Sequence, residues 1–128
     1  MARRELFPIL ACQDLPTARR FYAEVLGAGQ QYRFPAEGVP VYLTLSIGES
    51  SLGLAVGTCQ NAYGERPLPA TGHPVDLCVY VDDLDAVLAA AGRAGGALVA
   101  EAAEMPWGER VGWIRDPDGV HILVIQGD

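Results

Sequence analysis

Hydrophobic side chains recur along this chain with two different periods. A short apolar run over residues 5–12 predicts a strand, and the segment after it repeats apolar residues at the spacing of one helix face, at Leu15, Ala18, Phe21 and Val25. Asp14 stands where a helix N-cap is expected, and Gly27 supplies the stop. Three more strands are predicted, over residues 31–34, 41–47 and 52–56.

The same order of patterns returns in the second half of the chain. Residues 75–81 predict a strand, and a helix capped by Asp82 or Asp83 follows it and ends at Gly95-Gly96. The remaining strands are predicted over residues 98–105, 109–115 and 120–125. Asp116-Pro117-Asp118-Gly119 favours a tight turn between the last two, because proline presets one backbone angle and glycine accepts a positive one. A uniform shift of 69 residues carries Asp14 onto Asp83, Gly27 onto Gly96 and Leu54 onto Leu123.

The repeated order predicts an α+β fold of two tandem βαβββ modules. We expect their curved mixed β-sheets to surround a cavity and their helices to cover the outer faces. A chain of 128 residues fits one domain, with module one over residues 1–57, a linker over 58–74 and module two over 75–128.

Charge and composition narrow the classes of partner. Nine Lys and Arg against 16 Asp and Glu give a net charge of −7, which argues against nucleic-acid binding because that needs a basic surface. The N-terminal residues lack the pattern of a signal peptide, and no apolar run reaches the roughly 18 residues of a membrane span. The three cysteines, Cys12, Cys59 and Cys78, show neither a disulfide framework nor metal-ligand spacing. We therefore expect a cytoplasmic protein without a membrane partner.

Two segments carry a resemblance to a known family. Residues 11–22, Ala-Cys-Gln-Asp-Leu-Pro-Thr-Ala-Arg-Arg-Phe-Tyr, with Leu26-Gly27 beyond them, resemble the first helix of the vicinal oxygen chelate superfamily. Trp107-Gly108-Glu109-Arg110 followed by Asp116-Pro117-Asp118-Gly119 resembles its closing hairpin, particularly in antibiotic-binding members. The superfamily includes glyoxalase I, extradiol dioxygenases and the bleomycin-resistance proteins. The resemblance thus implies the fold, whereas metalloenzymes and metal-free binders both remain possible.

The resemblance also implies where a metal would bind. Metalloenzymes of the superfamily take ligands from the first and fourth strands of each half, and the matching positions here are Phe7, Leu54, Asp76 and Leu123. A single carboxylate cannot hold a divalent ion, which needs at least three oxygen or nitrogen donors. A shifted set of His73, Asp76 and His121 is chemically possible but leaves the first half without a donor. We predict no metal and no cofactor.

Strand alternation predicts the lining of the cavity, because every second side chain of a strand points to the same face. The lining would be apolar with a few polar groups, which is the usual make-up of a ligand site. Trp107 would act as a hydrophobic plug or as a platform for a flat ligand. The predicted ligand-binding residues are Phe7, Ile9, Leu54, Asp76, Cys78, Tyr80, Trp107, Arg110 and Leu123.

Part of this set depends on the register of the last hairpin. If Gly112 lies opposite Leu123, Arg110 shares the cavity face and Trp113 packs under a helix on the other face. Asp76 would then either select a positively charged ligand or pair with Arg110 as a structural ion pair. The apolar residues at the former metal positions would contact the ligand or simply fill the core.

No pairing of nucleophile and base stands out, so we predict no catalytic residues. Resemblance to the bleomycin-resistance group implies a metal-free protein that sequesters a small aromatic or cationic compound such as an antibiotic. The alternative is a metal-dependent glyoxalase-type lyase or a dioxygenase, and a third possibility is an accessory domain. We expect a homodimer, formed side by side or by exchanging halves.

Overall fold

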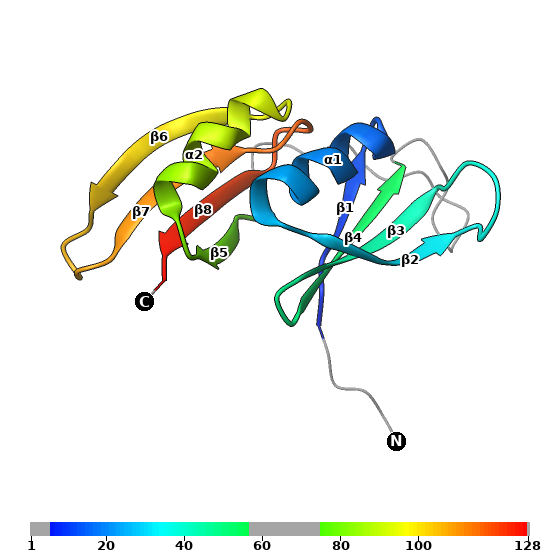
Figure 1. Ribbon diagram of the computed structural model, residues 1–128, viewed down its shortest axis with the longest axis horizontal. Helices are drawn as coiled ribbons and strands as arrows, with labels where there is room; N and C mark the ends of the chain where they lie inside the picture. The colour runs from blue at the N-terminus through cyan, green and yellow to red at the C-terminus, as the bar shows by residue number, and fades with distance from the viewer. Residues whose placement is uncertain (1–5, 57–74, 128) are drawn as a thin grey trace, which may run out of the picture.

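Each half of the chain folds into the predicted order of strands and helix. The computed structural model describes residues 6–56 and 75–127, so the predicted linker lies outside the described residues. The first module contains β1 (Ile9–Cys12), α1 (Leu15–Leu26), β2 (Gly29–Phe34), β3 (Tyr42–Ile47) and β4 (Ser50–Val56). The second contains β5 (Leu77–Val81), α2 (Leu84–Arg93), β6 (Ala97–Glu104), β7 (Arg110–Arg115) and β8 (His121–Gln126) (Figure 1). The predicted fold class, α+β with two βαβββ modules, is confirmed.

The helices begin and end close to the predicted residues. The Asp83 carboxylate accepts a hydrogen bond from the Ala86 backbone N–H at 3.1 Å, which satisfies one free donor at the start of α2. The Asp14 side chain instead accepts from the Thr17 hydroxyl at 2.7 Å. Gly27 ends α1 in the left-handed conformation, with φ of 69°. In the second module Gly95 takes this role, with φ of 93°, rather than Gly96 as the uniform shift predicts.

Both modules build a four-stranded mixed sheet with the same topology. The strand orders are β1-β4-β3-β2 and β5-β8-β7-β6. The first strand of each module runs parallel to the last, and the other neighbours are antiparallel.

The last hairpin differs by one residue between the modules. Ser46 of β3 pairs with Ser51 of β4, which leaves four residues between them, whereas Arg115 of β7 pairs with His121 of β8 across five. The shift of 69 residues therefore holds from β1 to β3 and becomes 70 at the final strand. Leu123 thus corresponds to Gly53, not to Leu54.

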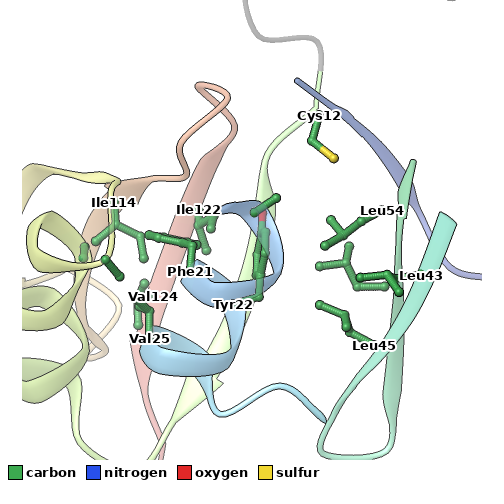
Figure 2. Packing of buried hydrophobic residues seen from close by; sticks show 14 of the residues in the cluster. Cys12, Phe21, Tyr22, Val25, Leu43, Leu45, Leu54, Ile114, Ile122 and Val124 are labelled. Atoms are coloured by element: carbon green, nitrogen blue, oxygen red, sulfur yellow. The ribbon is translucent and has the colours of Figure 1, made fainter. Parts of the chain in front are cut away.

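One hydrophobic core joins the two modules. It contains the apolar faces of α1 and α2 and the helix-facing side of each sheet. Figure 2 shows α1 between the sheets, with Phe21 directed toward Ile114 and Ile122 and with Tyr22 directed toward Leu54. Within one chain the helices therefore cover one side of each sheet, and α1 packs against both sheets. Within residues 6–56 and 75–127, neither helix is long and apolar enough to cross a membrane.

Because the helix-facing sides share one core, the opposite sides of the two sheets face outward. We call these sides the open faces. On the first sheet the open face includes Ile9, Tyr32, Tyr42, Thr44 and Gly53, which cross-strand pairing places in neighbouring rows. On the second sheet it includes Cys78, Tyr80, Val111, Trp113, Leu123 and Ile125.

Candidate ligand-binding site

The candidate site lies on the open face of the second sheet. Cross-strand pairing aligns Tyr80 with Ile125 and Val111, and a neighbouring row aligns Cys78 with Leu123 and Trp113. Val111 and Ile125 are 3% and 4% exposed, although neither belongs to the core beneath the helices. This face therefore has a buried apolar floor of its own.

A carboxylate stands over this floor between two aromatic side chains. The Trp107 indole Nε1–H donates to Oε1 of Glu109 at 2.9 Å, and the Tyr80 hydroxyl donates to Oε2 at 3.2 Å. The turn between β6 and β7 fixes this end of the site, because the Met105 backbone N–H donates to the Glu109 carbonyl at 2.7 Å. Trp107 and Tyr80 are each 66% exposed, so their rings leave much of their surface accessible.

The charge of Glu109 also affects Cys78 on β5, although β8 separates β5 from β7 in the sheet. Partial burial raises the pKa of the Cys78 thiol, and the nearby Glu109 carboxylate raises it further. The thiol therefore faces the same space as the carboxylate. In the register of β7 and β8, Arg115 lies opposite His121, in the next row of the open face beyond Trp113 and Leu123.

The open face of the first sheet is aromatic and carries hydroxyl groups. The Tyr32 and Tyr42 rings lie 6.2 Å apart between centroids, and the Thr44 hydroxyl donates to the Tyr42 oxygen at 3.1 Å. Ile9 and Tyr42 lie over Gly53, where an added Cβ would come within 2.9 Å of Ile9 Cγ1. Gly53 thus permits the close approach of both side chains.

The structure gathers part of the predicted ligand-binding set. Cys78, Tyr80 and Leu123 share the open face of the second sheet, Trp107 joins them through Glu109, and Asp76 stands just before β5. Ile9 lies on the open face of the first sheet, with Phe7 two residues before it. In the part of the chain that the structure describes, the two groups lie on different sheets. Their role in binding stays a prediction.

Two predicted residues lie on the wrong side of their sheets. Leu54 is fully buried in the shared core, where it pairs with Leu43 and Leu10. Because the turn between β3 and β4 is one residue shorter than the turn between β7 and β8, Gly53 takes the open-face position that was predicted for Leu54. Arg110 also faces the helix side, where its guanidinium pairs with Asp85 of α2 at 2.8 Å. The predicted alternative of an Asp76–Arg110 pair is therefore wrong.

The last hairpin explains why Trp113 and Glu109 were missed. Trp113, not Gly112, lies opposite Leu123, so Trp113 belongs to the open face and the prediction that it packs under a helix is wrong. Glu109 lies an even number of residues before Trp113 and so points to the same side of the sheet. The signal that could have identified both is the length of the turn after Arg115, which sets the register of β7.

The donor set does not fit the metal site of the resembled metalloenzymes. With Gly53 in place of Leu54, the four corresponding positions still offer one carboxylate, that of Asp76. Among the described residues no three His, Cys, Asp or Glu side chains gather closely enough to hold a metal ion. The shifted set considered above includes His73, which lies outside the described residues.

Comparisons with known proteins agree with this architecture. A sequence model of the Glyoxalase/Bleomycin resistance protein/Dioxygenase superfamily matches residues 6–124. The chain is 30% identical over 119 residues to the uncharacterized protein Rv0887c of Mycobacterium tuberculosis, covering 91% of this chain and 70% of that protein. It is 31% identical over 118 residues to the putative glyoxylase CFP32 of Mycobacterium bovis, covering 85% of this chain but only 38% of that protein.

Solved structures share the fold over nearly the whole chain. TioX from Micromonospora sp. ML1 superposes with a TM-score of 0.75 and 24% identity, covering 97% of this chain and 98% of TioX. The hypothetical protein SA1046 from S. aureus gives a TM-score of 0.79 and 21% identity, covering 99% and 96%. At these identities the likeness concerns the fold alone.

Proposed function

The chain belongs to the Glyoxalase/Bleomycin resistance protein/Dioxygenase superfamily, and we propose that within it the protein binds a small aromatic or cationic molecule without a metal. The observation that carries this proposal is the Glu109 carboxylate held between Trp107 and Tyr80 above a buried apolar floor. A flat ligand would stack on the indole ring, which stabilises an aromatic pair by roughly 1 kcal/mol beyond burial. Binding alone would sequester a compound such as an antibiotic.

A second copy of the chain is proposed to complete the site. Each open face of one chain points outward, and together they expose Ile9, Tyr32, Phe34, Tyr80 and Trp107, each more than half accessible. Exposed apolar patches of this kind favour association. Pairing the first sheet of one chain with the second sheet of another, about a twofold axis, would cover both faces and form two equivalent sites. Each site of this dimer would thus combine the first module of one chain with the second module of the other.

The competing function is a metal-dependent glyoxalase-like activity. One observation favours it, the 31% identity to a putative glyoxylase, although this chain spans less than two fifths of that relative. The donor set argues against it, because Phe7, Gly53 and Leu123 contribute no oxygen or nitrogen side-chain donor at the corresponding positions.

Elemental analysis and a thermal-shift screen separate these functions. The binder is expected to purify with substoichiometric Zn, Ni, Fe and Mn, and a chelator should leave its Tm unchanged. An aromatic or cationic antibiotic should raise the Tm as its concentration exceeds Kd. A stoichiometric metal together with a chelator-sensitive Tm would contradict the proposal.

A further inference from the structure

We infer that Glu109 makes the site selective for aromatic ligands that carry a positive charge. This inference rests on the proposed function and adds to it the class of ligand and the residue that selects it. The sequence pointed to Asp76 for this role, whereas the geometry points to Glu109.

The hydrogen bonds of Glu109 orient its carboxylate without neutralising it. Both donors, the Trp107 indole and the Tyr80 hydroxyl, are uncharged, and each binds a different carboxylate oxygen. An ionised carboxylate offers about four acceptor positions, so each oxygen retains one for a ligand. Among the described residues no arginine or histidine forms an ion pair with Glu109, since Arg110 is turned to the opposite face and pairs with Asp85.

The rings beside the carboxylate favour the same ligand chemistry. A cation above the face of Trp or Tyr is attracted by the ring electrons, and a planar cation also stacks on the ring. An incoming N–H⁺ or N-alkyl cation on the ring would lie beside the Glu109 carboxylate and attract it directly. A ligand of the same shape without charge would gain only the apolar and stacking contribution.

Two probes that differ mainly in charge test the inference. We would titrate the protein with 1-methylquinolinium and with neutral 2-methylquinoline at pH 7.5 by calorimetry. The native protein is expected to bind the cation about ten to a hundred times more tightly, as a charge-assisted contact implies. Glu109→Gln should abolish this preference and leave the affinity for 2-methylquinoline within about twofold. Glu101→Gln, a carboxylate of β6 in the groove on the helix side, is the matched control and should keep the preference.

The results separate failure of the inference from failure of the proposed function. The selective role of Glu109 would be overturned if the native protein bound both probes with equal affinity. It would also be overturned if Glu109→Gln lowered the affinity for both probes equally. In either case the proposed binding function would stand. Binding of neither probe by the native protein would overturn the proposed aromatic site and the inference with it. Denaturant unfolding of Glu109→Gln verifies that the variant remains folded.

Discussion

The Tyr22 hydroxyl donates a hydrogen bond to the Asp116 carboxylate at 2.8 Å and so connects the helix of one module to the last turn of the other. Both residues are buried. The backbone N–H groups of Asp118 and Val120 also donate to this carboxylate, at 2.9 and 2.8 Å. Asp118 in turn accepts from the Gln13 backbone N–H at 3.0 Å. The Asp-Pro-Asp-Gly turn therefore closes a hairpin and also holds the modules together.

Removal of the Tyr22 hydroxyl should weaken this junction. Tyr22→Phe leaves a buried carboxylate without one of its three donors, so we expect the free energy of unfolding to fall by about 1–3 kcal/mol. Denaturant unfolding measures the change. Tyr32→Phe, which removes the hydroxyl of an exposed tyrosine, is the control and should change stability by less than about 0.5 kcal/mol. Equal stability of the two variants would contradict the proposed importance of the junction.

The stability contributed by Asp116 should depend on pH in a defined direction. Burial raises the pKa of this carboxyl above its ordinary value, and its hydrogen bonds oppose only part of the rise. Between the unfolded and the higher folded pKa, the native state therefore binds more protons than the unfolded chain. The free energy of unfolding of the native protein, minus that of Asp116→Asn, should thus fall as pH rises through this window. A difference that rises with pH would contradict the shift.

Two glycines of the second module should respond oppositely to alanine. At Gly96 an added Cβ would lie 2.3 Å from the Arg115 carbonyl oxygen and 2.5 Å from Phe21 Cε2, so Gly96→Ala should destabilise the protein by about 1–3 kcal/mol. At Gly92, within α2, nothing lies within 4 Å of an added Cβ, and Gly92→Ala should stabilise it by about 0.5–1 kcal/mol. Thermal or denaturant unfolding of both variants measures this. If Gly92→Ala lowered the free energy of unfolding as much as Gly96→Ala, the packing described here would be refuted.

Alkylation rates should report the distance between Glu109 and Cys78. Burial raises the pKa of the Cys12 thiol to about 12, so in a Cys59→Ser background iodoacetamide at pH 8 should modify Cys78 and spare Cys12. Glu109→Gln removes a charge that raises the pKa of Cys78, so alkylation there should accelerate. Mass spectrometry of the labelled peptides gives the rates. An unchanged rate in Glu109→Gln would place the carboxylate away from the thiol.

The fold was predictable because local signals agree with the tertiary structure. The period of the apolar residues in α1, the stop at Gly27 and the turn ending at Gly119 each act within a few residues. The helix-facing residues then follow from alternation once the register is known. These are short-range properties, which a sequence records directly.

The site was predicted only in part because it depends on register and on the packing of modules. The turn between β7 and β8 is one residue longer than the turn between β3 and β4, so Gly53, and not Leu54 as predicted, lies on the open face. The register of β7 also differs by one residue from the predicted register, so Trp113, and not Arg110, lies on the open face. The role of Glu109 arises from side chains on β5 and on the turn before β7, which no local pattern brings together. The position of α1 between the sheets likewise follows from packing across modules.

The central claim, a binding site shared between the first sheet of one chain and the second sheet of another, is tested most directly by mixing two blocked variants. Thr44→Trp would fill the open face of the first sheet, and Leu123→Trp that of the second. Each variant alone should lose binding of 1-methylquinolinium, because both of its sites contain a blocked face. A mixed dimer, purified through two different tags after coexpression, should regain one site per dimer by calorimetry, whereas the native protein should show two sites per dimer. A mixed dimer that binds no ligand, or a blocked variant that binds as well as the native protein, would contradict the account.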